Sequence, residues 1–375
     1  MIRLYQICKR CIMDTSDPEI RFDTHGICNH CTAALERIHK QLLPLDHREK
    51  ALHALVEKIK LEGKGKEYDC IIGVSGGVDS TTTAYTVKKL GLEPLAVHFD
   101  NGWDSELAVD NIKKTLEIMN IDLYTYVVDW EEFRDLQLSF LKASVANCEA
   151  PTDHGITALL FRTASKQNVR YILSGSNLVT EGVAIPIAWG HYNQDLRQLK
   201  ALHRRFGRKP LQTMPTISIF DYFYYVFIKG IRQIPFLNYI NYNKAEAKRI
   251  MTKEIGWRDY GSKHYESVWT RFFQGYYLPT KFGFDKRRAH LSTIICSGGM
   301  TRDEALAEME KPAYPEGLLR EDMQFVIKKF GLTQEKFDAI IHVPSKQATD
   351  YPNHYFLFHK LQGYKNIFRR IATSA

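Results

Sequence analysis

The chain has 375 residues, of which 44% are hydrophobic and 25% charged, as in a water-soluble globular protein long enough for more than one domain. No internal repeat or low-complexity tract is present, which excludes solenoid and low-complexity classes. The formal net charge of +8 suits a phosphorylated substrate or, less securely, RNA, and does not choose between them.

The N-terminal residues lack the basic, apolar and small-residue order of a secretory signal, so we expect a cytoplasmic protein. The most apolar stretch, residues 217–231, contains Asp221 and Lys229 and is shorter than the roughly 20 residues that span a bilayer. We therefore predict no transmembrane segment. The many aromatic residues of this stretch predict a buried helix, with contact to a partner or a membrane surface as the alternative.

Four cysteines near the N-terminus are spaced as two C-x2-C pairs, Cys8 with Cys11 and Cys28 with Cys31. Four thiolates can complete a closed tetrahedron around zinc, and a closed site has no position for a substrate. The spacing predicts a structural zinc module over residues 1–35. Zinc should supply much of its folding energy, because so short a segment buries little apolar surface.

A charged helical linker is predicted over residues 36–66, and the main domain begins after it. Residues 69–74 read as a buried parallel strand, followed by the turn Ser75-Gly-Gly-Val-Asp-Ser80 and a helix to about Leu90. Glycines and serines at a helix start offer backbone N–H groups and hydroxyls to phosphate, and a carboxylate such as Asp79 can hold Mg²⁺. The order of strand, glycine turn and helix predicts a nucleotide phosphate site.

The turn resembles the PP-loop signature of N-type ATP pyrophosphatases, a superfamily that includes GMP synthetase, NAD synthetase and tRNA-thiolating enzymes. The resemblance implies that ATP is cleaved between its α and β phosphates and that the substrate is adenylylated. It assigns ATP binding to the loop residues Ser75, Gly76, Gly77, Val78, Asp79 and Ser80, with His98 and Phe99 beside the adenosine and Ser174, Gly175 and Asn177 against the nucleotide or activated substrate.

Further strands are predicted at 94–99, 123–128 and 171–174, with helices at 105–120 and from about 155 to 167. Alternating strands and helices predict an α/β fold, a doubly wound parallel sheet. Ligands of such sheets bind beyond the carboxyl ends of the strands. The turns that follow three strands, at 75–80, 98–101 and 174–177, should therefore form one crevice for ATP.

Three features together resemble the N-acetyl sugar amidotransferase family of lipopolysaccharide and surface-polysaccharide biosynthesis. They are the four-cysteine module directly before the PP-loop domain, Gly256-Trp-Arg-Asp-Tyr-Gly-Ser-Lys-His-Tyr-Glu266, and Leu278-Pro-Thr-Lys-Phe-Gly-Phe-Asp-Lys-Arg-Arg-Ala-His290. The resemblance implies conversion of an acetamido group on a nucleotide-linked sugar to an acetamidino group. It also implies ammonia from a separate glutaminase that works with a cyclase-like subunit. We expect no DNA partner.

Candidate substrate residues follow in the C-terminal half. The basic cluster Lys281, Lys286, Arg287 and Arg288 could bind diphosphate or carboxylate, or form a solvated helix face. Tyr265, Glu266 and Arg271, with His264, could orient the sugar, the nucleotide or the amine, or pack against the sheet.

Catalytic candidates lie in Asn147-Cys-Glu-Ala-Pro-Thr-Asp-His154. Cys148 has a structural and a catalytic interpretation, because a thiolate could carry sulfur in a PP-loop tRNA sulfurtransferase, the alternative function. Asp153 and His154 are the better acid/base candidates by residue type. RNA is the less favoured partner, since no second cysteine accompanies Cys148. The predicted domains are completed by a PP-loop domain at 67–190 and a mainly helical region at 191–375.

Overall fold

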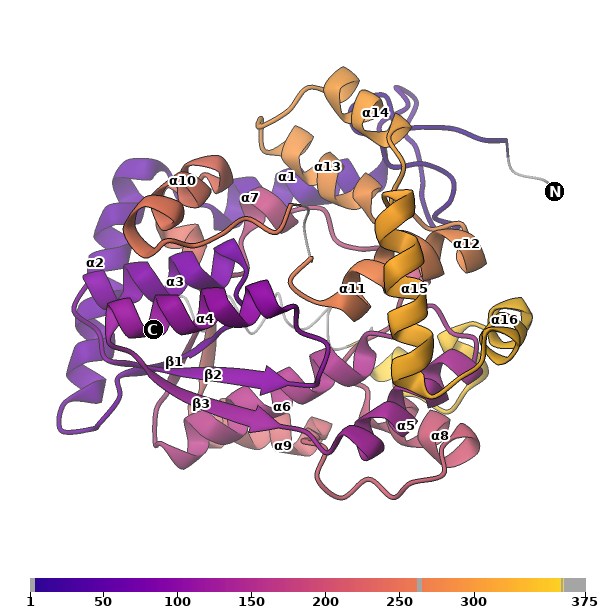
Figure 1. The fold of residues 1–375 in the computed structure, drawn as a ribbon. Helices are drawn as coiled ribbons and strands as arrows, with labels where there is room; N and C mark the ends of the chain where they lie inside the picture. Colours follow the sequence, from indigo (N-terminus) through magenta and orange to yellow (C-terminus); the bar gives the residue numbers. More distant parts are fainter. Residues whose placement is uncertain (1–3, 262–264, 359, 361–375) are drawn as a thin grey trace.

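The computed structural model describes residues 4–261, 265–358 and 360, and within them it forms one five-stranded parallel sheet (Figure 1). The strand order is β3-β2-β1-β4-β5, and every neighbouring pair is parallel. The strands are β1 (Cys70–Gly73), β2 (Pro94–Asp100), β3 (Asp122–Val127), β4 (Tyr171–Ser174) and β5 (Arg232–Pro235). Because β2 and β4 lie on opposite sides of β1, the chain order reverses there, as in a doubly wound sheet.

Helices cover both faces of the sheet, because successive strand residues point to opposite faces. Ile71, Val97 and Ile172 pack toward α6 (Ala150–Lys166). Cys70 and Ile72 pack toward α3 (Val78–Lys89) on the other face. The remaining helices of these two layers are α4 (Glu106–Met119), α5 (Trp130–Lys142), α8 (Leu196–Phe206) and α10 (Lys244–Ile255). The predicted α/β fold is confirmed.

Four of the five strands were predicted; β1, β2 and β4 are buried runs of mainly apolar residues, whereas β3 is mostly exposed. β5 was not predicted, since Arg232 and Gln233 are exposed and polar and Pro235 ends the strand. The C-terminal half therefore contributes an edge strand to the sheet as well as helices.

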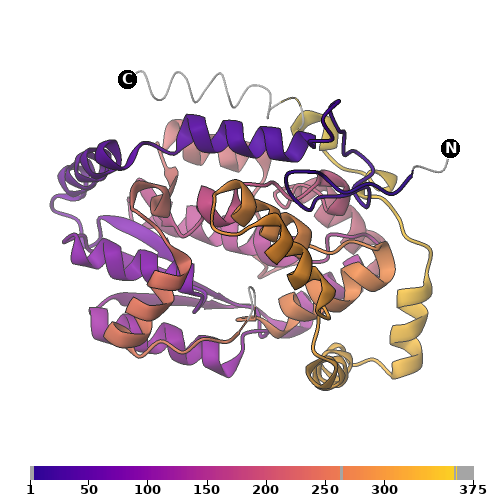
Figure 2. The same ribbon diagram turned by 90° about the horizontal axis from the view of Figure 1, so that it is seen from above.

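The N-terminal part leads into two helices, α1 (Asn29–Gln41) and α2 (Leu45–Gly63), where one charged linker was predicted. They are separated at Pro44, the N-cap of α2. Val56 and Ile59 of α2 are buried in the same core as α3. Figure 2 shows the N-terminal coil beside the orange C-terminal helices rather than apart from the rest of the chain.

The region after β4 is mainly helical, as predicted. Its elements are α7 (Leu178–Glu181), η1 (Ile187–Trp189), α9 (Ile219–Phe223), η2 (Tyr224–Ile228), η3 (Phe236–Tyr239), α11 (Val268–Phe272), η4 (Phe273–Tyr277), α12 (Leu278–Phe282), α13 (Arg287–Cys296), α14 (Arg302–Glu310), α15 (Glu316–Phe330), α16 (Gln334–His342) and η5 (Ala348–Asp350). α15 and α16 are separate helices, because α15 ends at its C-cap Gly331 with φ +68°.

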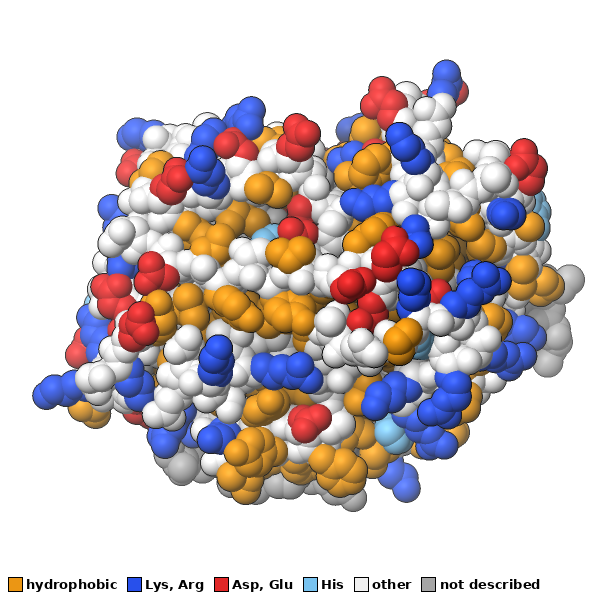
Figure 3. Space-filling view, turned by 60° about the horizontal axis from the view of Figure 1, so that its bottom comes forward, with side chains coloured by type: hydrophobic (Ala, Val, Ile, Leu, Met, Phe, Trp, Pro, Cys, Tyr) orange, Lys and Arg blue, Asp and Glu red, His pale blue; other side chains and the backbone are white. Residues whose placement is uncertain are grey.

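The aromatic stretch 217–231 is not the fully buried helix that was predicted. Tyr222 and Tyr225 pack against Phe161, at ring-centroid distances of 5.3 and 5.9 Å. Phe220 and Ile228 are instead 86% and 74% exposed. α9 lies at the bottom of Figure 1, and hydrophobic side chains gather along the lower edge of Figure 3, which brings that side forward. Across the described ranges, no helix has both the length and the apolar character needed to cross a bilayer.

Candidate active site

The turn between β1 and α3 is held in shape by its glycines. Gly76 has φ +75°, and a Cβ there would lie 2.3 Å from the carbonyl oxygen of Ala108. The carbonyl oxygen of Gly76 accepts a hydrogen bond from Trp257 Nε1 at 2.9 Å. Gly77 is the N-cap of α3 and provides no side-chain cap. The start of α3 has the amides and the positive dipole end that suit a phosphate, but Gly76 and Gly77 are buried in this structure, with the Tyr260 hydroxyl 3.1 Å from the Cβ position of Gly77.

A second glycine turn lies against this helix start. A Cβ on Gly175, after β4, would meet the backbone of Asp79 at 2.9 Å and the amide nitrogen of Ser80 at 3.1 Å. Ser80 Oγ in turn lies 3.3 Å from both the amide nitrogen and the hydroxyl of Ser75. The predicted convergence of the 75–80 and 174–177 turns is thus seen in the contacts.

A cavity of about 750 Å³ opens at the carboxyl ends of the strands. Its volume is in the range of small-molecule sites. Among the ATP-binding candidates, those that line it are Ser75, His98, Phe99, Ser174 and Gly175. Asn101, Glu149, Asp153, Glu266 and Lys286 also line it, so the cavity extends from the loop to α6 and the start of α13.

His98, at the end of β2, is held by two contacts. Its Nδ1 lies 3.0 Å from the carbonyl oxygen of Val74, and its Nε2 lies 3.3 Å from Asp104 Oδ2. Burial lowers the pKa of His98, but the hydrogen bond and charge of Asp104 outweigh burial and raise the pKa above its usual value. Both His98 and its partner Asp104 line the cavity.

Several ATP-binding candidates support the turns instead of lining the cavity. The side chain of Asp79 accepts a hydrogen bond from the Tyr242 hydroxyl. Asn177 caps α7 by accepting from the amide of Thr180 at 2.9 Å. Gly76, Gly77, Val78, Asp79, Ser80 and Asn177 are not among the lining residues. The Mg²⁺ role of Asp79 stays a prediction, and the hydrogen bond from Tyr242 is compatible with it because that bond uses only Oδ1 of the carboxylate.

The placement of Cys148 does not support its catalytic interpretation. The residue is 0% exposed, does not line the cavity, and donates its thiol hydrogen to the carbonyl oxygen of Val145 at 3.4 Å. Burial raises the pKa of the thiol to about 12, which disfavours the reactive thiolate.

His154 is likewise a poor acid/base group, contrary to expectation. It is 0% exposed, its Nδ1 donates to the carbonyl oxygen of Asn193 at 2.9 Å, and its Nε2 accepts from the amide of Ile217 at 3.1 Å. Burial lowers its pKa. Both ring nitrogens are used to join α6 to two loops, so the role is structural.

The basic cluster is mostly engaged within the protein. Lys281 Nζ donates to the carbonyl oxygens of Ile341 at 2.6 Å and Val343 at 2.7 Å, where α16 ends. Arg287 pairs with Asp285 at 2.8 Å and donates to the carbonyl oxygen of Lys311 at the same distance. Of the cluster, Lys286 alone lines the cavity.

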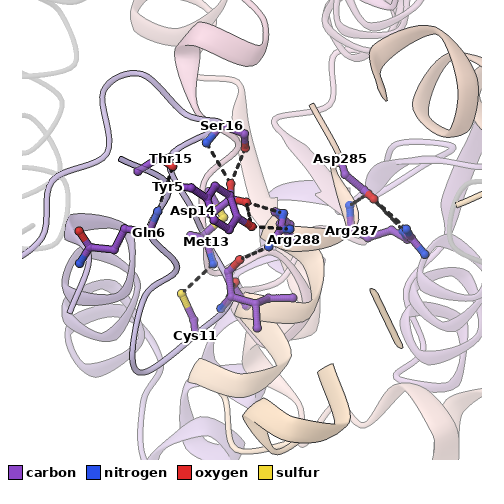
Figure 4. Close-up of polar contacts among 12 residues, drawn as sticks. Tyr5, Gln6, Cys11, Met13, Asp14, Thr15, Ser16, Asp285, Arg287 and Arg288 are labelled. Carbon is purple, nitrogen blue, oxygen red and sulfur yellow. Dashed lines mark hydrogen bonds and ion pairs between the residues drawn. The ribbon is translucent and has the colours of Figure 1, made fainter. Parts of the chain in front are cut away.

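Arg288 fastens the N-terminal module to α13 (Figure 4). It contacts Asp14 Oδ2 at 3.0 Å, the carbonyl oxygen of Ile12 at 2.9 Å and the hydroxyl of Tyr5 at 3.2 Å. The carboxylate of Asp14 is also bonded by the amide of Ser16 at 3.1 Å. Figure 4 shows Arg287 directed to Asp285 on the other side. Substrate binding by Arg287 and Arg288 is therefore not supported.

The three substrate-binding candidates around residue 266 have different surroundings in the structure. Glu266 lines the cavity. Arg271 forms a two-point ion pair with Asp322, at 2.5 and 2.7 Å, and its guanidinium lies 5.7 Å from the ring centroid of Tyr265. Tyr265 and Arg271 therefore brace α11 against α15, and His264 lies outside the described residues.

Replacing Arg288 by alanine is expected to lower stability and leave substrate affinity nearly unchanged. Asp14 is 2% exposed, and removing the partner of a buried ion pair costs up to about 3–5 kcal/mol, part of which the hydrogen bonds from Tyr5 and Ser16 would offset. Denaturant unfolding measures this, and Asp14→Asn in the Arg288→Ala background should recover part of the loss. A raised KM for the substrate with unchanged stability would contradict this role of Arg288.

Glu149 was not predicted, although it lies within the segment that was singled out. It is 8% exposed, and its Oε2 accepts from the hydroxyl of Thr270 at 2.8 Å. Burial and the charge of Asp153 raise its pKa to about 8. The raised pKa of Glu149 comes from its burial at the cavity. The sequence did not predict this burial, because a glutamate near a helix start is usually solvent-exposed.

The four N-terminal cysteines come together as predicted. All are buried, and their sulfurs lie within 4.8 Å of one another. The Cys8–Cys31 and Cys11–Cys28 sulfur separations are both 3.7 Å. A zinc ion with bonds of about 2.3 Å has sulfurs about 3.8 Å apart, so these residues fit a tetrahedral ion. The amides of Arg10 and Met13 also point at sulfurs, at 3.4 Å, which would stabilise thiolates.

Comparison with known proteins adds a family match, one relative that aligns over most of the chain and one partial relative. Residues 266–364 match the family model of the C-terminal domain of WbpG-like LPS biosynthesis proteins. An uncharacterized protein of Methanocaldococcus jannaschii is 23% identical over 323 residues, 84% of this chain and 96% of that protein. A glutamine-hydrolyzing GMP synthase of Pyrobaculum aerophilum is 37% identical over 129 residues, 32% of this chain and 24% of that enzyme.

Among solved structures, the NMN synthetase of Francisella tularensis is similar, with a TM-score of 0.31 at 15% identity, over 59% of this chain and 99% of that one. This likeness is partial, and the fold assignment rests on the strand order of the sheet. The family match confirms the resemblance to a lipopolysaccharide-biosynthesis family over residues 266–364.

Proposed function

We propose that the protein is an ATP-dependent, AMP-forming amidotransferase that acts on the acetamido group of a nucleotide-linked sugar. ATP adenylylates the acetamido oxygen, ammonia adds at the same carbon, and AMP leaves with the oxygen. An amide oxygen is a poor leaving group, and its phosphate ester makes it a good one. The product is an acetamidino sugar for lipopolysaccharide O-antigen or another surface glycan.

The single observation that carries this proposal is the position of one cavity. It joins the glycine turn of Ser75 to a carboxyl-rich wall that includes Glu149 and Asp153. The glycine turn suits ATP phosphates, with Mg²⁺ held by Asp79. The carboxyl groups suit an incoming amine. The match of residues 266–364 to an LPS-biosynthesis domain supports a glycan substrate, and the match to a glutamine-hydrolyzing GMP synthase supports ammonia chemistry.

The other parts of the proposal follow from the resemblance to the N-acetyl sugar amidotransferase family. Zinc at the four cysteines has a structural role, since a site closed by four thiolates leaves no position for a substrate. Ammonia is supplied by a separate glutaminase with a cyclase-like subunit, and the protein works in the cytoplasm. The burial of Cys148 counts against the alternative of a tRNA sulfurtransferase, which needs an accessible thiolate.

The test is a comparison of two substrate classes. Purified protein with ATP, Mg²⁺ and an ammonium salt is supplied either with UDP-linked diacetamido sugars or with unmodified tRNA. We expect AMP and pyrophosphate only with a sugar, and a product lighter by about one mass unit because NH replaces O. AMP formation only with tRNA would reject the amidotransferase.

A further inference from the structure

The cavity wall opposite the glycine turn holds two carboxyl groups one helical turn apart. Glu149 is the N-cap of α6 and Asp153 lies in its first turn, so this spacing places both on one face of the helix. Both residues line the cavity. The charge of Asp153 acts on Glu149, which shows that the two groups are close enough to interact.

One oxygen of each carboxyl group is held by a neutral donor. Thr270 donates its hydroxyl to Glu149 Oε2 at 2.8 Å, and Asn193 donates its side-chain amide to Asp153 Oδ2 at 2.5 Å. Glu149 Oε1 is buried and has no hydrogen-bond partner among the described residues. A buried, unpartnered carboxyl oxygen is costly, so a ligand with an N–H donor would relieve that cost.

The charges around Glu149 favour a small amine over a divalent cation. Burial and the charges of Asp153 and Glu266 raise the pKa of Glu149, and Lys286 lowers it, with a net value of about 8. The carboxyl group can therefore release and take up a proton near neutral pH, as a general base requires, and Lys286 already supplies one positive charge. Neutral ammonia can donate an N–H to the unpartnered oxygen without a second ionised carboxylate, whereas Mg²⁺ is bound through ionised carboxylates.

We propose that Glu149, supported by Asp153, binds the incoming ammonia and takes a proton from its nitrogen as that nitrogen adds to the adenylylated acetamido carbon. This inference rests on the proposed function. The nitrogen lone pair forms the C–N bond, and the proton passes to the Glu149 carboxylate. The C–O bond to AMP then breaks, AMP leaves with that electron pair, and the amidine remains.

The test separates the two half-reactions. Sugar-dependent exchange of labelled pyrophosphate into ATP, without ammonia, reports adenylylation alone. We expect Glu149→Gln to keep this exchange within about threefold of the wild type. It should lower kcat/KM for ammonium about 10²- to 10⁴-fold, the range of general-base catalysis. Glu335→Gln, an exposed glutamate on α16, is the control and should change neither.

A second nucleophile distinguishes proton transfer from a structural effect. Hydroxylamine is a weaker base than ammonia and is already neutral at pH 7, so Glu149→Gln should impair its reaction far less. An equal loss with both nucleophiles would overturn the proposal. Loss of the exchange itself, or a changed Mg²⁺ requirement for it, would also overturn it, because Glu149 would then serve ATP or metal. Wild-type protein without sugar-dependent exchange would reject the proposed function and, with it, this role.

The fold of the variant is checked by the pH dependence of stability. The folded protein keeps the Glu149 proton up to a pKa of about 8, whereas an unfolded glutamate loses it near 4.5. The unfolded chain thus binds fewer protons between these values, and ionisation of Glu149 in the unfolded chain lowers the stability of the folded state as pH rises through them. Glu149→Gln lacks this cost, so its melting temperature relative to wild type should rise from pH 5 to pH 8.

Discussion

Replacing Gly76 by alanine is expected to abolish ATP binding and AMP formation. Gly76 has φ +75°, and the new Cβ would lie 2.3 Å from the Ala108 carbonyl oxygen and 2.8 Å from its Cα. These are backbone atoms, so α4 or the turn must shift. A shift of the turn moves the amides that we expect to hold phosphate. We expect AMP formation to fall at least 100-fold, with about 1–3 kcal/mol lost in stability.

The matched control for this substitution is Gly65→Ala. Gly65 also has a positive φ, +80°, but nothing lies within 4 Å of its added Cβ. It should lose about 1 kcal/mol from backbone strain and keep ATP binding. Equilibrium ATP binding by calorimetry compares the two variants. Wild-type affinity in Gly76→Ala, with its fold intact, would show that ATP binds elsewhere.

Loss of one cluster thiol is expected to release zinc and unfold the N-terminal module. Cys11→Ser removes a ligand from four sulfurs that lie within 4.8 Å of one another. Zinc contributes about 10–16 kcal/mol to the folding of small zinc modules, so the segment should not stay folded without it. The contacts of Arg302 with the carbonyl oxygens of Cys8 and Cys11, each 3.1 Å, would be lost too.

Metal analysis and thermal unfolding measure this effect. Wild type should carry about one zinc per chain and Cys11→Ser close to none, with a melting temperature lower by several degrees. Cys148→Ser is the control, since its thiol is also buried but lies outside the cluster. It should keep its zinc. Equal zinc contents in Cys11→Ser and wild type would contradict a metal role for the cluster.

The parts of this account that the sequence predicted are local in the chain. The strand, turn and helix around Ser75 follow each other within about twenty residues. The spacing of the two C-x2-C pairs is enough to predict a site formed by four sulfurs. Apolar runs and turn residues are sufficient to place such elements.

The parts that the sequence did not predict depend on distant partners. Arg288 looked like a substrate ligand because the sequence shows its positive charge. The sequence does not show that the Asp14 carboxylate binds that charge in the folded protein. His154 looked reactive because its two backbone partners come from other loops. Glu149 was missed because its raised pKa arises from burial in the folded cavity. Side-chain type is local information, whereas burial and pairing are properties of the fold.

The central claim is that the acetamido oxygen becomes the leaving oxygen of AMP. It is tested most directly by supplying the nucleotide-linked sugar with ¹⁸O in its acetamido carbonyl and analysing the AMP by mass spectrometry. We predict that the AMP carries the label and that the amidine product has lost it. AMP without label, from a reaction that still forms the amidine, would contradict adenylylation of the acetamido group.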